Sequence, residues 1–243
     1  MKIKILYLCL LVSLGTSAQS LEGRPYFELS PGKALAFGPM TQSNSTFLKY
    51  TGAWSFNLGF TKYSSEGQLM NKDVIGYHFG YQFHSNTLDE SDLLSITPVP
   101  NAYFVSKGNQ LIHGPVFRLE YTRSGVFAPY AGIGAHLLAV RGSWFDLEFD
   151  AQQNYYQKAS YKTSTWGTIN PAFSVYGGIR VVMPGNWTIG LHYETYLRDA
   201  WSAKYTIIGT PATIDNTEVS RSFTLTEIGW LHHGELRVQF PLR

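Results

Sequence analysis

The chain is poor in cysteine and in charge. Its 243 residues include a single cysteine, Cys9, so it cannot form an internal disulfide or a zinc site built from several thiolates. Charged residues make up 15% of the sequence, whereas typical soluble domains have about 25%. This low charge content predicts that much of the surface faces something other than water.

Helical periodicity and fixed-period repeats are also missing after the N-terminus, and no later apolar run reaches the length of about 18 residues typical of a membrane-spanning helix. Aromatic residues, in contrast, reach 15%, and 23 glycines are spread along the chain. Aromatic residues favour strands, and glycine occurs in a strand where there is no room for a side chain. The composition therefore favours an all-β protein.

The first 18 residues have the layout of a secretory signal peptide. Two lysines precede an apolar run over 5–14, and Ala18 ends a group of small residues at the expected cut. A signal anchor would need about 20 apolar residues. A lipoprotein would need its cysteine next to the cut, but Cys9 lies inside the apolar run. We predict a cleavable signal peptide over 1–18 and one domain over 19–243.

Removal of that segment makes the chain nearly neutral, with 17 basic residues against 17 acidic ones. The pI of 8.5 thus partly reflects the signal peptide. No basic stripe is present to engage phosphates, so nucleic acid is not a predicted partner. The mature chain also has no thiol nucleophile.

Eight segments alternate between apolar and polar residues, which is the period of a strand. In 187–198, for example, Leu191 falls on the apolar phase and Glu194 on the polar phase. The first segment is interrupted by Pro31 and Gly32, where we expect a bulge or break because proline has no amide hydrogen to donate. The segments lie near 26–37, 54–61, 75–84, 117–122, 132–137, 173–181, 187–198 and 227–240.

The connections between these segments alternate in length. The short connections cover 64–72, 124–127 and 184–186, and the mostly long ones cover 38–48, 86–109, 142–165 and 200–222. In an up-and-down meander every second connection falls at the same end, so the chain has a short-turn end and a long-loop end. This asymmetry is typical of bacterial outer-membrane barrels, with periplasmic turns and extracellular loops.

Three features favour lipid, rather than a soluble core, on the apolar side of the strands. Many glycines fall on the polar phase, where small residues leave room for large polar ones inside a narrow barrel. The polar phase carries opposite charges in balance, and aromatic residues recur near strand ends, as in an interfacial girdle. A shift of every strand by one residue would turn four arginines toward hydrocarbon at about 2–4 kcal/mol each. The sum is comparable with a typical domain stability of about 5–15 kcal/mol, so the register is well determined.

The predicted fold is therefore an all-β, eight-stranded antiparallel up-and-down transmembrane β-barrel with a polar lumen. Side chains just fill a barrel of this size, so an open pore is not expected. A structural plug is the main interpretation, and a narrow or gated ion path is the alternative. The predicted lumen network consists of Arg118, Glu120, Arg180, His192, Glu194, Arg198, Glu227, Glu235 and Arg237.

The chain resembles the small eight-stranded outer-membrane β-barrel proteins of Gram-negative bacteria, the OmpA/OmpX-like porin-family group, over essentially all of the mature sequence. Its ending GELRVQFPLR is similar to the C-terminal strand that the barrel-assembly machinery recognises in that group. Leu236, Val238 and Phe240 match the alternation, but they lie at even offsets from Gly234 where the family has odd ones. The resemblance implies outer-membrane lipid and the barrel-assembly machinery as partners, with both termini in the periplasm.

Two clusters contain residue types that act in catalysis or bind metal ions in other proteins. His84, Ser85 and Asn86 resemble the His and Ser of outer-membrane lipid A deacylases and phospholipases, but adjacent strand residues point to opposite faces. We predict no enzyme activity and keep a lipid-modifying hydrolase as the alternative. For the same reason His232 and His233 cannot chelate one metal from one face, and His233 is expected to hydrogen-bond to a lumen carboxylate. No metal site and no cofactor are predicted.

The long loop over 142–165 mixes aromatic and acidic residues. Its alternation is expected to extend two strands above the membrane. Tyrosine and tryptophan also supply much contact area at little entropic cost, so an extracellular ligand or a host surface is the predicted partner of this loop. A secreted soluble ligand-binding barrel is the remaining alternative. The predicted loop contacts are Trp144, Phe145, Phe149, Tyr155, Tyr156 and Tyr161.

Overall fold

In the computed structural model, the described residues form strands and the turns between them. The described residues are 21, 23–37, 53–64, 73–86, 103–107, 110–123, 125–141, 145–148, 156–163, 168–198, 200–211, 219–228 and 230–242. Within these ranges no helix has the length and apolar character needed to cross a membrane. The predicted signal peptide over 1–18 lies outside the described residues.

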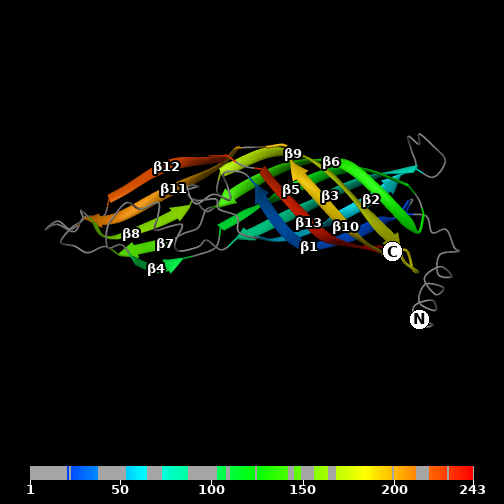
Figure 1. Cartoon of the computed structure of the whole chain (residues 1–243), viewed down its shortest axis with the longest axis horizontal. Helices are drawn as coiled ribbons and strands as arrows, with labels where there is room; N and C mark the ends of the chain where they lie inside the picture. Colours follow the sequence, from blue (N-terminus) through cyan, green and yellow to red (C-terminus); the bar gives the residue numbers. More distant parts are fainter. Residues whose placement is uncertain are drawn as a thin grey trace.

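Eight of the strands close into a barrel in which neighbours in the chain are neighbours in the sheet, all antiparallel, and β13 pairs back to β1 (Figure 1). This is the predicted up-and-down barrel, and each of the eight predicted segments overlaps one of its strands. The barrel strands are β1 (Pro25–Phe37), β2 (Ala53–Ser64), β3 (Asp73–Asn86), β5 (Gln110–Arg123), β6 (Phe127–Arg141), β9 (Thr168–Val182), β10 (Thr188–Tyr196) and β13 (Trp230–Pro241).

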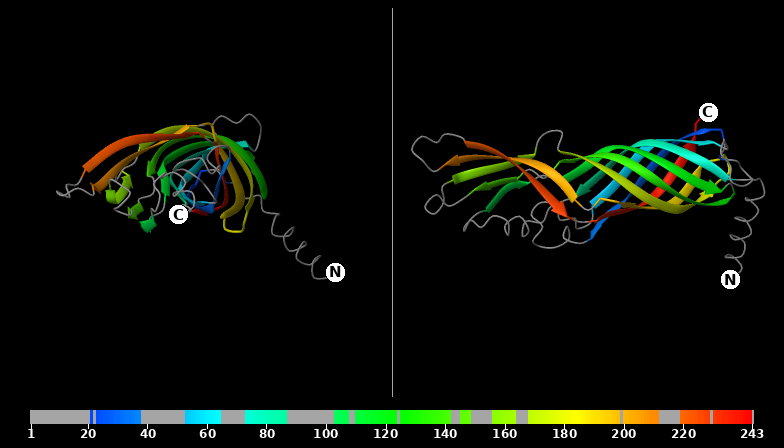
Figure 2. Two further views of the ribbon diagram at one scale, coloured as in Figure 1. Left: turned by 60° about the vertical axis from the view of Figure 1, so that its left-hand side comes forward. Right: turned by 90° about the horizontal axis from the view of Figure 1, so that it is seen from above.

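A second, five-stranded sheet lies beyond one end of the barrel, with the order β12-β11-β8-β7-β4 (Figures 1 and 2). Its strands lie mostly in three stretches predicted to be long loops, and β12 also extends past the third of them to Ile228, because strand pairing continues after the chain leaves the barrel wall. As expected, β7 and β8 pair with each other. The strands are β4 (Tyr103–Lys107), β7 (Phe145–Glu148), β8 (Tyr156–Thr163), β11 (Ala200–Pro211) and β12 (Val219–Ile228).

The interruption expected at Pro31 and Gly32 is a break in one ladder, without a bulge. Pairing of β1 with β13 stops after Leu29↔Val238 and resumes at Gly32↔Glu235 in the same register, because proline has no amide hydrogen to donate. Pairing of β1 with β2 continues through Pro31 without a shift. Gly32 lets the strands stay close, since a Cβ there would lie 2.7 Å from the Glu235 Cα.

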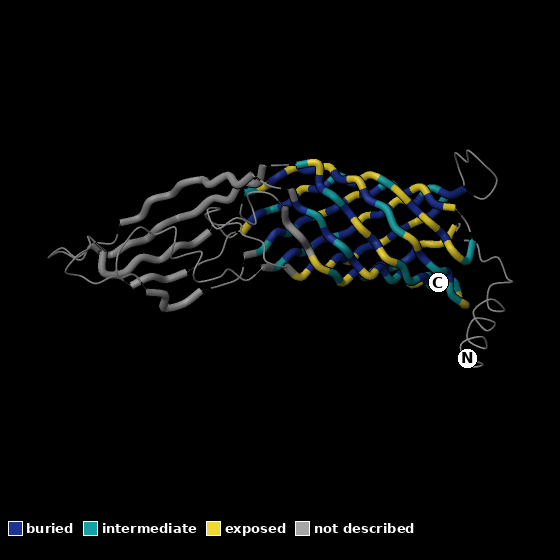
Figure 3. The backbone as a smooth tube through the Cα atoms, in the orientation of Figure 1, coloured by how far each residue is buried: buried dark blue, intermediate teal, exposed yellow. Residues whose placement is uncertain are grey.

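Burial alternates along the barrel strands (Figure 3). The buried positions are mostly polar and the exposed ones mostly apolar. Leu191 is 65% exposed and Phe173 is 68% exposed on the outer face. On the inner face, Arg118 is 1% exposed and Glu194 is fully buried. The phase of these strands is the predicted one, and the charged residues form the core.

Two glycines make room for tyrosine rings in this core. Tyr130 lies opposite Gly178, and Tyr176 lies opposite Gly132, in the β6–β9 ladder. A Cβ on either glycine would come within 2.5 Å of the Cζ atom of the opposite ring. The rings therefore lie flat over positions that carry no side chain, and this is why glycine appears in the polar phase.

Candidate functional site

The short-turn end of the lumen holds two arginines between two carboxylates. The guanidinium of Arg180 donates to Glu120, and that of Arg237 donates to the same carboxylate and lies 2.6 Å from Oε2 of Glu28. The ring of Tyr130 lies against both arginines, with centroid distances of 4.3 Å to Arg180 Cζ and 5.2 Å to Arg237 Cζ. This arrangement pairs charges that would be unstable alone in a buried interior.

Hydrogen bonds around Glu28 join the first barrel strands to the last one. Its Oε2 atom accepts from Thr61 Oγ1 at 3.0 Å and from Gln239 Nε2 at 2.9 Å. His78 Nδ1 lies 3.5 Å from the same oxygen. Side chains from β2, β3 and β13 therefore all contact the carboxylate of Glu28 on β1.

A second group, which we term the Glu194 cluster, consists of Glu194, Arg118, His136, His192 and His233. Arg118 contacts the Glu194 carboxylate with Nε at 3.3 Å and Nη2 at 2.5 Å. His136 Nε2 lies 3.0 Å from Oε1, while His233 Nε2 and His192 Nε2 lie 3.0 Å and 3.5 Å from Oε2. One carboxylate is thus surrounded by a guanidinium and three imidazoles.

The strand register explains how this cluster forms. Glu194 lies directly opposite His233 in the β10–β13 ladder, and His192 precedes Glu194 by two residues on the same face. Arg118 and His136 come from β5 and β6, which do not pair with β10. Alternation along β10 and its pairing with β13 therefore bring His192, Glu194 and His233 together. Arg118 and His136 reach them only because the barrel closes.

Further hydrogen bonds lead from the Glu194 cluster toward the second sheet. The Tyr196 hydroxyl donates to Gln82 Oε1 at 2.8 Å, and Gln82 Nε2 lies 3.0 Å from His233 Nε2. His84 Nε2 lies 3.1 Å from the Tyr196 hydroxyl. His84 is buried in the lumen, and Ser85 is half-buried on the opposite phase, so the two side chains diverge as the strand pattern predicts.

Two residues of the predicted lumen network lie elsewhere. Arg198 follows β10 and donates to the Pro171 carbonyl at 2.8 Å and to Asn170 Oδ1 at 3.0 Å. Glu227 lies on β12, opposite Trp201 in the second sheet, because the predicted segment over 227–240 divides between β12 and β13. The remaining seven are buried in the barrel, namely Arg118, Glu120, Arg180, His192, Glu194, Glu235 and Arg237.

The predicted loop contacts fall partly on the second sheet. Phe145 begins β7, and Tyr156 and Tyr161 lie on β8. The other three, Trp144, Phe149 and Tyr155, lie outside the described residues.

Sequence reasoning missed several lumen residues. Glu28 was missed because Pro31 and Gly32 obscure the phase of the first strand, and His78 and His136 were left out of the predicted network. His233 was expected to hydrogen-bond to a lumen carboxylate, and its Nε2 atom lies 3.0 Å from Oε2 of Glu194. The sequence did contain a sign of their position. Each of these residues alternates in step with glycines or charged residues of its own strand, which indicates that it faces the lumen.

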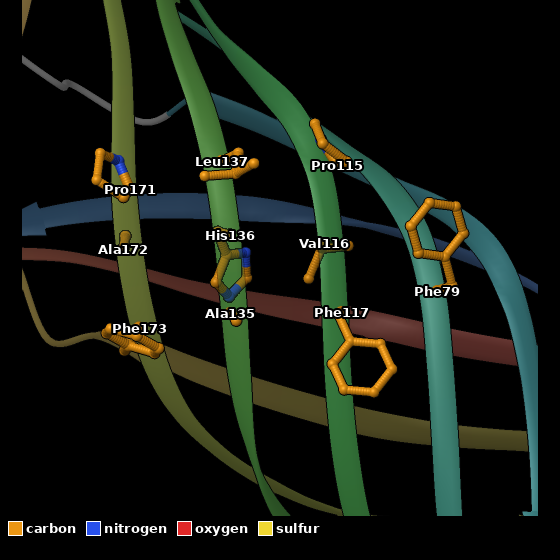
Figure 4. A pocket seen from close by; sticks show the side chains of 10 residues that line it. All are labelled: Phe79, Pro115, Val116, Phe117, Ala135, His136, Leu137, Pro171, Ala172 and Phe173. Carbon is orange, nitrogen blue, oxygen red and sulfur yellow. The ribbon is translucent and has the colours of Figure 1, made fainter.

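The outer wall carries an apolar groove of about 450 Å³ across β3, β5, β6 and β9 (Figure 4). The rings of Phe79, Phe117 and Phe173 border it, and the small side chain of Ala135 lies between them. All three rings are exposed. The groove is therefore part of the apolar exterior, and one residue of the Glu194 cluster, His136, is among those that border it.

No family model and no curated protein matches the chain. Similar solved structures include a major outer membrane protein from Thermus thermophilus, with a TM-score of 0.42 and 11% identity over 90% of this chain and 100% of that one. The outer membrane protein OprG from Pseudomonas aeruginosa has a TM-score of 0.45 and 14% identity over 91% and 99%. An outer membrane channel from Pseudomonas putida has a TM-score of 0.25 and 10% identity over 93% and 98%.

Proposed function

We propose that the chain is an integral outer-membrane β-barrel protein with a plugged lumen, and that it has a structural or surface-interacting role without catalysis. The observation that carries this proposal is the inverted polarity of the barrel. Leu191 and Phe173 are about two-thirds exposed, whereas Arg118 and Arg180 are at most 2% exposed. In water such an exterior would be a very large apolar patch, which monomeric soluble proteins rarely carry. In lipid it is favourable, and the closed ladder leaves no unpaired strand edge.

The two ends of the barrel have different roles in this proposal. Strand β1 starts and β13 finishes at the short-turn end, remote from the second sheet (Figure 1). We assign this end to the periplasm, after export by the predicted signal peptide over 1–18 and insertion by the barrel-assembly machinery. The second sheet then lies outside the cell, where its surface and the connecting segments meet an extracellular ligand or a host surface.

The closed lumen is supported by contacts that cross the barrel. Arg118 and Glu194 come from strands that are not neighbours, and so do Arg180 and Tyr63. Side chains just fill an eight-stranded barrel. The network therefore supports a plug rather than an ion path.

Membrane insertion is tested by gel mobility of the extracted protein in SDS, unheated against boiled, with recovery from the outer-membrane fraction. We expect a heat-dependent shift and membrane recovery. A protein that is soluble without detergent and shows no shift would instead be a secreted ligand-binding barrel.

The plug is tested separately by conductance after reconstitution into planar lipid bilayers. We expect no steady conductance from protein that shows the gel shift. Stable channels of uniform size from the same preparation would replace the plug with a pore.

The hydrolase alternative predicts acyl release from lipopolysaccharide or phospholipid, and loss of that release in His84→Ala. His84 contacts Tyr196 rather than a serine hydroxyl. We therefore expect the lipids of cells expressing the wild type and His84→Ala to be the same by mass spectrometry. Acyl release by the wild type alone would establish an enzyme.

A further inference from the structure

Histidine is concentrated inside the barrel. Five of the seven histidines of the chain are buried in the lumen, and they are His78, His84, His136, His192 and His233. A plug of ion pairs does not require imidazole, which is usually uncharged near neutral pH and is the commonest metal-binding side chain. The histidines around Glu194 therefore need a second explanation.

His233 Nε2 has two polar neighbours. Glu194 Oε2 lies 3.0 Å from it, and the amide nitrogen of Gln82, whose Oε1 accepts from Tyr196, also lies 3.0 Å from it. The tautomer of His233 decides which of these two contacts is a hydrogen bond. In the tautomer with its hydrogen on Nδ1, Nε2 presents its electron pair beside the Glu194 oxygen, as two ligands of one metal ion do.

A metal ion satisfies both atoms at once. The ligand atoms of a tetrahedral zinc site lie about 3.4 Å apart, given zinc–ligand bonds of about 2.0–2.1 Å. Glu194 Oε2 lies 3.0 Å from His233 Nε2 and 3.5 Å from His192 Nε2. One ligand atom from each of these three residues lies within 4.8 Å of the other two. We propose that His192, Glu194 and His233 bind one divalent transition-metal ion of the zinc type inside the barrel.

The surroundings of the three residues suit a bound cation. Arg118 contacts both oxygens of Glu194, with Nη2 2.5 Å from Oε2 and Nε 3.3 Å from Oε1. A metal ion at Oε2 takes the place of the Nη2 contact, and the Nε contact with Oε1 remains. His192 Nδ1 lies 3.3 Å from the Tyr130 hydroxyl, a contact that orients the ring as in other metal sites. Among the inward-facing residues of the described barrel strands, four carboxylates face three guanidinium groups, namely Glu28, Glu120, Glu194 and Glu235 against Arg118, Arg180 and Arg237. With neutral histidines this interior is negative, and a cation compensates it.

The test uses the full mature chain without a polyhistidine tag, refolded in detergent with Zn²⁺ present so that access through a closed lumen does not limit binding. After dialysis, metal content is measured by mass spectrometry. Co²⁺ is used in parallel because its visible absorption reports tetrahedral coordination. We expect one metal ion per folded chain. The SDS gel shift is measured on the same sample, so a failure of metal binding is distinguishable from a failure of membrane-barrel formation.

The matched variants are His233→Ala and His232→Ala, which change adjacent residues on opposite faces of β13. We expect His233→Ala to weaken binding by more than about tenfold, and His232→Ala to leave it unchanged. If His233→Ala does not fold, His192→Ala provides the same comparison. A wild type that retains no stoichiometric metal, or equal losses in His232→Ala and His233→Ala, would overturn the site.

Discussion

Arg118 and Glu194 meet across the barrel interior, with Nη2 of Arg118 2.5 Å from Oε2 of Glu194. The pair joins β5 to β10, between which β6 and β9 lie in the barrel wall. Both side chains are essentially inaccessible to solvent. The contact therefore spans the cross-section of the lumen instead of joining neighbouring strands. The burial of each charge is stabilised by a partner from a distant strand.

Removal of one member of this pair should be strongly destabilising. In the metal-free barrel, Arg118→Gln leaves Glu194 buried with its charge uncompensated, which costs about 3–5 kcal/mol for buried pairs. We expect this loss in urea unfolding of the barrel in lipid vesicles, followed by tryptophan fluorescence. Arg123→Gln is the matched control, because Arg123 is exposed at the end of the same strand. We expect the control to stay within about 0.5 kcal/mol of wild type. Equal effects of the two changes would contradict a buried pair.

A charge on the outer face should be costly only near the middle of the barrel. Leu191→Arg places a guanidinium on an exposed position of β10, where lipid contact costs about 2–4 kcal/mol near the bilayer midplane. Phe127→Arg, at the turn end of β6, should cost about 0–1 kcal/mol. The same vesicle unfolding assay measures both changes. Equal tolerance of arginine at the two positions would mean that water covers this face.

A methyl group should be tolerated at Gly177 but not at Gly178. A Cβ on Gly178 would lie 2.5 Å from Tyr130 Cζ and also meet the Leu191 carbonyl, whereas a Cβ on Gly177 would lie 3.4 Å from its nearest neighbour, the Tyr130 carbonyl oxygen. Overpacking of this kind costs about 1–3 kcal/mol. We therefore expect Gly178→Ala to lower the midpoint of thermal unfolding, measured by the SDS gel shift against temperature, and Gly177→Ala to leave it nearly unchanged. A reversed order would show that Tyr130 does not need this space.

The period of two in the sequence was enough to predict the barrel. Leu191 and Glu194 identify the two faces of β10 from the sequence alone. Because one face must meet lipid and the other the lumen, a shift of the strand by one residue would place every side chain on the wrong face. The second sheet was not predictable in the same way. The partner of β11 on one side is β8, more than 30 residues away in the chain, and no local pattern identifies such a pairing.

The candidate site shows the same division. Alternation along β10 and β13 predicts that His192, Glu194 and His233 face inward. It does not predict that His136 on β6 and Arg118 on β5 reach the same carboxylate, because that depends on the barrel radius and on side-chain length. The break predicted at Pro31 is present in the β1–β13 ladder, but the sequence does not show that the same register resumes at Gly32.

The hydrogen bond between Glu28 and Gln239 joins residues 211 positions apart. Glu28 lies on the first barrel strand, and its partners Gln239 and Arg237 lie on the last one. Until β13 arrives, this carboxylate lacks the cation that compensates it, and an unpaired buried charge costs several kcal/mol. A seven-stranded assembly is therefore a poor resting state. Closure of the wall and neutralisation of its first strand occur together, which makes the folding of this barrel cooperative from the first strand to the last.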